Sequence, residues 1–89
     1  MNIKISEAVL CQEISGETVL LDLASEQYFG LDAVGTRVWQ LLQQNRSRDG
    51  ILEQMLQEYN VPPEVLLQDL DELLRNLQSA GLVRVETAG

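Results

Sequence analysis

Apolar and polar residues alternate in short runs over the first third of the chain. Residues 18–23 have the period of two that is typical of strands, and residues 8–14 mix apolar and polar residues with Val, Leu and Ile, which is consistent with a strand. Residues 15–17 between them form a turn signal. A break at residues 24–26 separates a third short run, residues 27–31. This pattern predicts an antiparallel meander of three strands.

From residue 32 onward the apolar positions recur at the spacing of amphipathic helices. Asp32 can cap a first helix, because its carboxylate can accept hydrogen bonds from early backbone amides. The apolar face of that helix consists of Val34, Val38, Trp39, Leu41 and Leu42. A second helix begins at Ser47 or Asp49 and runs to about residue 59, with an apolar stripe of Ile51, Leu52, Met55, Leu56 and Tyr59.

The third helix is apolar over a broad part of its circumference. It starts at Pro63, which suits a first helical turn, and ends near residue 80, where Gly81 can terminate it. One ridge consists of Leu66, Leu70, Leu73 and Leu77, and a second of Leu67 and Leu74. Two interpretations remain open: the helix is well buried, or it offers part of its apolar surface to a partner. Beyond it, residues 82–85 predict a terminal extended segment and residues 87–89 a frayed tail.

The third strand carries an aromatic pair followed by a glycine. Tyr28 and Phe29 must point to opposite faces of the sheet, so one can join the core while the other needs a different partner. Gly30 within a strand indicates a bulge or a close approach of another backbone. Gly35 lies inside the first helix, and close packing of that helix against the sheet would explain it.

The order of strands first and helices after predicts the fold class. We expect an α+β domain with helices packed on one face of a three-stranded antiparallel sheet, in an element order like that of a winged helix-turn-helix. With 89 residues, the whole chain, residues 1–89, is expected to form a single domain.

The charge of the chain disfavours two classes of partner. Fourteen acidic and six basic residues give a formal charge of −8. Such a surface repels phosphate backbones and anionic lipids, so neither nucleic acid nor a membrane is an expected partner. It attracts a basic protein or peptide, or it serves only solubility.

Residues for covalent chemistry are almost absent. The chain has no histidine and one cysteine, Cys11, so it can form neither a Cys-His nucleophile pair nor a Cys/His metal site. No phosphate-binding glycine loop is present either. We therefore expect no enzyme, no catalytic residue, no metal and no cofactor, and we expect Cys11 to be a small buried hydrophobe. With no signal-peptide pattern and no membrane span, a cytoplasmic protein is expected.

Motifs spread over the chain resemble those of a known family. From about residue 9 to 85 they follow in order as Tyr28-Phe29 with Leu31, Gly35, Val38-Trp39 and Leu41-Leu42, then Glu58-Tyr59, Val61, Glu64, Asp69-Leu70, Leu73-Leu74, Leu77 and Gly81-Leu82-Val83. In this order and spacing the chain resembles the PqqD-like recognition elements of ribosomal peptide (RiPP) biosynthesis. It is most similar to the stand-alone leader-binding proteins of lasso-peptide pathways.

The resemblance implies a function and a site. Proteins that look like this bind the leader region of a precursor peptide, which adds as a strand to the third β-strand in a groove closed by the third helix. Carried onto this sequence, the peptide-binding residues are Gln27, Tyr28, Phe29 and Gly30 on the strand, Leu66, Leu70, Leu73 and Leu77 on the helix, and Asp69 and Glu72 beside them to meet basic residues of the leader.

The resemblance also implies partners, and other functions remain open. In lasso pathways the bound leader passes to a separate leader-cleaving cysteine protease, and an ATP-dependent cyclase closes the ring. One alternative is a PqqD-type peptide chaperone for a radical SAM enzyme in quinone cofactor synthesis. A winged-helix DNA-binding regulator is another, which the acidic third helix argues against. A third is an adaptor or oligomerisation domain.

Overall fold

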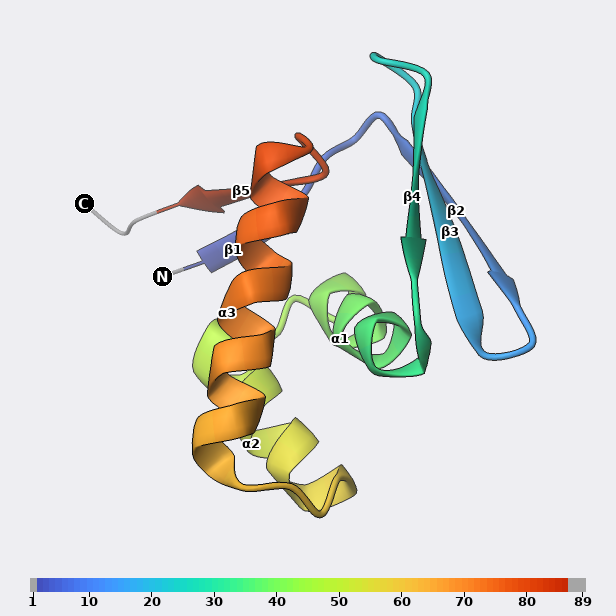
Figure 1. The fold of residues 1–89 in the computed structure, drawn as a ribbon. Coiled ribbons are helices and arrows are strands. Elements are labelled where there is room, and N and C mark those ends of the chain that lie inside the picture. The colour runs from blue at the N-terminus through green and yellow to red at the C-terminus, as the bar shows by residue number, and fades with distance from the viewer. Residues whose placement is uncertain (1, 87–89) are drawn as a thin grey trace.

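The computed structural model describes residues 2–86, so the expected tail at residues 87–89 lies outside the described residues. Its elements follow in the order β1 (Asn2–Ile5), β2 (Val9–Ile14), β3 (Glu17–Asp22), β4 (Gln27–Leu31), α1 (Ala33–Gln43), α2 (Arg48–Glu58), α3 (Pro63–Ser79) and β5 (Val83–Glu86). As Figure 1 shows, the sheet of β2, β3 and β4 stands on one side of α1, and α2 and α3 lie on the other. The α+β fold with a three-stranded antiparallel sheet followed by three helices is confirmed.

Two turns connect the three strands of the meander, one stabilised by positive φ angles and the other by side-chain hydrogen bonds. β2 and β3 are joined at Ser15 and Gly16, whose φ angles are 53° and 82°. A two-residue hairpin turn with both φ angles positive matches the twist of the strands that it joins. The turn from β3 to β4 is held by Asp22, whose carboxylate accepts hydrogen bonds from the Ala24 amide at 3.1 Å and the Ser25 hydroxyl at 2.8 Å.

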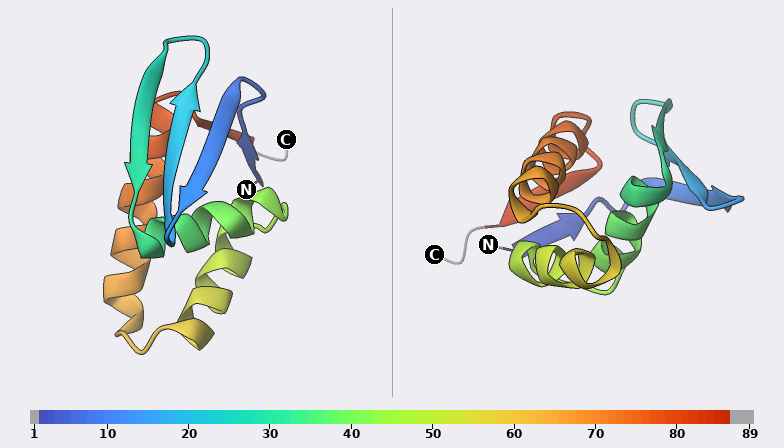
Figure 2. Two further views of the ribbon diagram at one scale, coloured as in Figure 1. Left: turned by 90° about the vertical axis from the view of Figure 1, so that its right-hand side faces the viewer. Right: turned by 60° about the horizontal axis from the view of Figure 1, so that its bottom comes forward.

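The sheet buries the less apolar of the two faces of its central strand. Thr18, Leu20 and Asp22 on β3 are buried, whereas Val19 on the opposite face is exposed. Residues that pair across strands share a face, so Phe29 and Leu31 of β4 join the inner side, and Tyr28 points outward. Among the described elements, no helix covers the outer face (Figure 2, left).

A side-chain cap determines where α1 begins, and close packing at the same end of the helix explains why residue 35 is a glycine. The Asp32 side chain accepts a hydrogen bond from the Gly35 amide at 2.8 Å, as expected for an N-cap. A Cβ at Gly35 would lie 3.3 Å from atoms of both Asp32 and Leu31. Close packing of α1 against the end of β4 therefore accounts for this glycine, as the sequence predicted.

The helices close around one apolar core. Ser47 caps α2 by accepting from the Gly50 amide at 3.1 Å. At the end of α3, Gly81 adopts φ 77°, and the Leu82 amide donates to the Leu77 carbonyl at 3.0 Å, which closes the helix in a Schellman motif. The core comprises Ile3, Leu20, Leu31, Val38, Trp39, Leu41, Leu42, Ile51, Met55, Leu66, Leu70, Leu74, Leu77, Leu82 and Val83.

Two features differ from the sequence-based expectations. The extended segment after α3 is β5, and it pairs antiparallel with β1, a strand that the sequence pattern did not predict. Cys11 is exposed and not buried, because β2 is an edge strand. The side-chain amide of Gln43 donates to its sulfur at 3.6 Å. Within residues 2–86, no helix is long and apolar enough to cross a membrane.

An ion pair between α1 and α2 gives the fold a pH-dependent contact. Arg37 Nε and Nη2 donate to the two carboxylate oxygens of Glu58, both at 2.7 Å, and Gln54 adds a third bond at 2.8 Å. These hydrogen bonds, chiefly from Arg37, lower the pKa of Glu58 from 4.5 to about 2. Because the pKa is lower in the folded state, the pair stabilises the fold above pH 4.5 and this stabilisation is lost as the pH falls toward 2.

We therefore predict that Glu58→Gln is less stable than wild type at neutral pH, and that the difference shrinks between pH 4.5 and about 2. Thermal unfolding followed by circular dichroism across this range measures it. A stability difference that does not change with pH would mean that packing of the side chain, and not its charge, is what the substitution removes.

Candidate functional site: the edge of β4 and the groove beside α3

The free edge of β4 presents two residues with unpaired backbone groups. The Leu23 amide donates to the Ala8 carbonyl at 2.8 Å, so its backbone, with those of Leu21 and Val19, points toward β2. The alternate residues of β3 then bond to their partners on β4, which are Gln27, Phe29 and Leu31. The amides and carbonyls of Tyr28 and Gly30 consequently point away from β3 and are open to an added strand.

A groove runs beside this edge, between β4 and α3. It is a hollow of about 490 Å³ lined by Phe29, Gly30, Leu31, Asp32, Val34, Gly35, Asp69, Leu73 and Asn76. The strand, the first turn of α1 and the middle of α3 each supply part of its wall. A peptide paired with β4 would therefore project alternate side chains into it.

The groove combines an apolar wall with acidic groups. Phe29, Val34 and Leu73 supply apolar surface, and the side chains of Phe29 and Leu73 are half-buried against the core. Asp69 lies one helical turn before Leu73 and is exposed. Asp32 lies in the opposite wall, where its carboxylate also caps α1. Such a surface suits a peptide that has apolar anchors next to a basic residue.

Not all residues predicted for the site meet there. Phe29, Gly30, Asp69 and Leu73 line the groove, and Gln27 lies exposed at the start of β4. Leu66, Leu70 and Leu77 face the core instead, because the inner ridge of α3 runs through residues 66, 70, 74 and 77. Glu72 is exposed beside a different hollow, together with Glu64, Gln68 and Arg75. Tyr28 contributes its backbone to the edge, while its side chain points to the outer face.

Sequence reasoning missed Leu31, Asp32, Val34, Gly35 and Asn76 as groove residues. Asn76 could have been found, because it follows Asp69 and Leu73 at helical spacing and so shares their face. The sequence had already assigned Asp32 as a helix cap and Val34 to the apolar face of the first helix. They line the groove only because α1 packs close to α3, which the sequence does not show. Gly30 forms no bulge, since the pairing register of β3 and β4 is unbroken.

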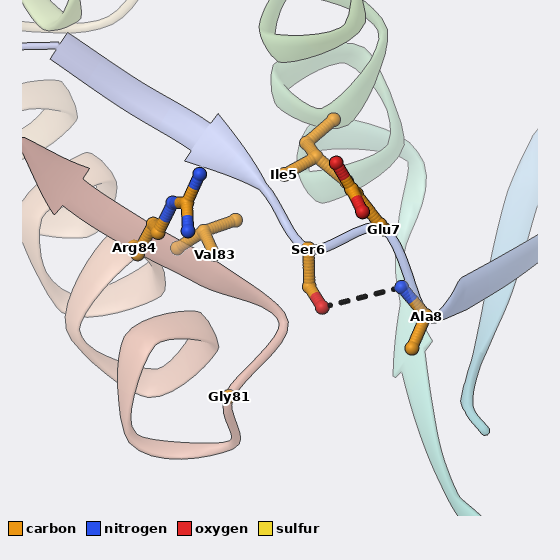
Figure 3. Close-up of a pocket in the computed structure, with 7 residues that line it drawn as sticks. All are labelled: Ile5, Ser6, Glu7, Ala8, Gly81, Val83 and Arg84. Atoms are coloured by element: carbon orange, nitrogen blue, oxygen red, sulfur yellow. Dashed lines mark hydrogen bonds between the residues drawn. The ribbon is translucent and has the colours of Figure 1, made fainter. Parts of the chain in front are cut away.

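A second hollow lies far from β4 along the chain, where the β1–β2 connection meets the start of β5 (Figure 3). It measures about 430 Å³ and is lined by Ile5, Ser6, Glu7, Ala8, Gly81, Val83 and Arg84. The Ser6 amide donates to the Leu82 carbonyl at 2.9 Å and ties the two segments together. Ile5 ends β1 and Val83 begins β5, which are the two strands of the smaller sheet. Over residues 2–86, no group of three acidic, cysteine or histidine side chains could hold a metal ion.

A model of a known protein family matches most of the chain. The family model described as coenzyme PQQ synthesis protein D (PqqD) matches residues 17–83, a span that begins at β3 and ends after α3. The chain belongs to the PqqD family, and the resemblance stated from its motifs is confirmed. No curated protein matches the chain at a significant level.

Two solved structures match almost the whole fold. The chain is similar to TbiB1, solved in complex with the TbiA(beta) leader peptide, with 39% identity, a TM-score of 0.88, and coverage of 94% of this chain and 98% of that one. It also matches a lasso peptide synthetase B1 complexed with the leader peptide, with a TM-score of 0.85 over 96% of this chain and 100% of that one. The identity to the second protein is 20%, so that similarity shows the fold alone.

Proposed function

We propose that this protein is a non-catalytic recognition element that binds the leader region of a ribosomally synthesised precursor peptide of the lasso class. The leader adds as a strand to the edge of β4, and alternate side chains enter the groove against α3. The observation that carries the proposal is the conjunction of a free strand edge at Tyr28 and Gly30 with a hollow that has both an apolar wall and carboxylates.

The similarity to TbiB1 supports leader binding, because the solved relative at 39% identity holds a leader peptide. The motif resemblance to the stand-alone lasso proteins is what favours a lasso pathway over the PqqD-type chaperone. The acidic surface of α3 argues against DNA binding. We further propose that the bound precursor is presented to a separate leader-cleaving cysteine protease and an ATP-dependent cyclase. Holding the leader fixes the remainder of the precursor near these enzymes and so raises its effective concentration.

Isothermal titration with the leader segment of the precursor encoded beside this chain tests the proposal. We expect one site with a Kd on the order of 1 μM or tighter, and no cleavage of the peptide by the protein alone. A folded protein that shows no binding at peptide concentrations of tens of micromolar would contradict the proposal. A Kd in that range corresponds to a binding free energy of about 6–7 kcal/mol.

The carboxylate of Asp69 is expected to act on the association rate. Because the groove is acidic and open to solvent, Asp69 attracts a basic leader residue over a distance that salt can screen. We predict that Asp69→Asn slows association by at most about fivefold, the scale of an exposed ion pair, and weakens its dependence on salt. Stopped-flow kinetics across a salt series measures both.

Glu72→Gln is the matched control, because it removes the same charge from the same helix beside a different hollow. Equal effects of the two variants would mean that the overall charge of −8, and not the groove carboxylate, steers the peptide.

A further inference from the structure

A strand added to the edge of β4 has two sides, and only one of them faces the groove. Residues that pair across neighbouring strands share a face of the sheet. A leader residue opposite Phe29 therefore points into the groove, whereas the leader residues opposite Tyr28 and Gly30 point to the outer face. The outer face around Tyr28 and Gly30 consequently contacts the leader as well.

Gly30 leaves a gap on the outer face, directly beside the added strand. A Cβ at Gly30 would project from this face, because Gly30 pairs with Val19, which is exposed there. That Cβ would meet no atom within 4 Å, and the backbone has no positive φ. A glycine weakens the interior of a strand. Neither packing nor backbone conformation within residues 2–86 therefore requires a glycine at this position.

Tyr28 and Val19 border the gap with uncharged side chains. Tyr28 lies two residues before Gly30 on β4 and so projects from the same face. It is 73% exposed, more than any other large apolar side chain that the structure describes. Val19 borders the gap on the side of β3. We call Val19, Tyr28 and Gly30 together the outer subsite.

We propose that the outer subsite binds an aromatic side chain of the leader, carried by the residue opposite Gly30. The ring lies over the Gly30 backbone, with Tyr28 diagonally beside it and Val19 beyond the glycine. Diagonal neighbours on adjacent strands are about 7–8 Å apart, a distance that aromatic side chains reach. Aromatic side chains cover edge glycines of sheets in this way, and a ring beside Tyr28 gains more than its buried area alone.

Length and charge both favour an aromatic ring over other side chains. A leader strand beside β4 lies about 10 Å from β3, so a short side chain such as valine does not reach Val19. Lysine or arginine is long enough, but the outer subsite has no carboxylate to pair with it.

The outer subsite rests on the proposed function and deepens it, because it requires the leader on β4. It predicts that the leader carries an aromatic residue directly next to the residue that enters the groove against Phe29 and Leu73. The leader is then recognised on both faces of the sheet.

Gly30→Val tests the outer subsite from the side of the protein. Valine fills the gap and favours an extended strand, so without the subsite it would leave leader affinity unchanged or strengthen it. With the subsite, valine displaces the ring, and we expect affinity to fall by about tenfold while the urea midpoint stays at or above that of wild type. Gln12→Val is the matched control, because Gln12 pairs with Val19 on its other side and so places the valine in the same row of the outer face, on β2. It is expected to bind the leader as wild type does.

A set of leader peptides completes the test. The leader of the precursor encoded beside this chain is made unchanged and with each aromatic residue replaced singly by alanine, and each peptide is titrated into full-length wild type and Gly30→Val. We expect one replacement to weaken binding to wild type by about tenfold and binding to Gly30→Val by at most about twofold, because the subsite is already filled in that variant.

Wild-type affinity in Gly30→Val, equal losses in Gly30→Val and Gln12→Val, or independent effects of Gly30→Val and every aromatic replacement overturns the outer subsite while leaving leader binding intact. A leader that binds without any aromatic residue overturns it too. So does a urea midpoint of Gly30→Val clearly below that of wild type, since atoms of the protein then occupy the gap. If wild type binds no leader, the proposed function falls and the outer subsite with it.

Discussion

Leu70→Asp is expected to unfold the protein. Leu70 is 2% exposed and lies on the inner ridge of α3, within the apolar core. A carboxylate placed there has no partner, and burying an unpaired charged or polar group costs several kcal/mol. The free energy of unfolding of a domain of this size is about 4–13 kcal/mol, so the substitution removes most of it.

Circular dichroism at 25 °C and urea unfolding measure this loss directly. Leu70→Ala is a useful second variant, expected to lose about 2–5 kcal/mol while keeping the fold detectable. A stable, folded Leu70→Asp that fails only to bind peptide would contradict our assignment and return Leu70 to the groove.

Leu73→Asp is expected to abolish leader binding while the protein stays folded. Leu73 lies only three residues after Leu70, but it is half-buried and lines the groove opposite Phe29 and Val34. A carboxylate at this position can reach solvent in the free protein, so the fold survives. When an apolar anchor of the peptide covers it, the charge loses its water, and affinity should fall by about 100-fold.

Titration calorimetry with the leader peptide measures the loss, and the urea midpoint checks the fold. Leu73→Ala separates the effect of the lost apolar contact from that of the added charge, and its affinity for the leader is expected to fall by about tenfold. Wild-type affinity in Leu73→Asp would show that the peptide does not use this groove.

The contrast between Leu70 and Leu73 shows that the sequence predicts the helix α3 but not which of its leucines face the core. Helical periodicity identified a leucine-rich helix and left open whether its broad stripe was core or binding surface. Leu74 was placed on a second ridge, yet it is buried with Leu66, Leu70 and Leu77. Which side of so apolar a helix faces inward is decided by the position of α1, α2 and β5 around it, and periodicity contains no information about those positions.

Strands were predictable where turn chemistry supported them. The three strands of the meander and the three helices follow from Ser15-Gly16, from the cap residues Asp32 and Ser47, and from Gly81. β1 was not predicted, because four residues at the chain start gain strand character only by pairing with β5, far along the chain. Amphipathicity alone also favours the wrong face of β3, since the side with Val19 and Leu23 is exposed.

The candidate site was predictable only in part, because the sequence does not show how the helices are placed around β4. The aromatic pair and Gly30 marked β4 as unusual, and the family resemblance gave the edge and the helix that closes the groove. Asp69 and Glu72 looked equivalent in sequence, but only Asp69 lines the groove. The outer sheet face became visible only once the inner face was known.

The central claim, that the leader adds as a strand to the edge of β4, is tested most directly by amide hydrogen exchange of the protein with and without the leader peptide. At saturation we expect the amides of Tyr28 and Gly30 to slow by at least about tenfold, because they gain partners, while those of Phe29 and Leu31, already bonded to β3, change far less. Slowed exchange at Cys11 and Glu13 on the opposite edge of the sheet, or no change at Tyr28 and Gly30 under saturating peptide, would contradict the account.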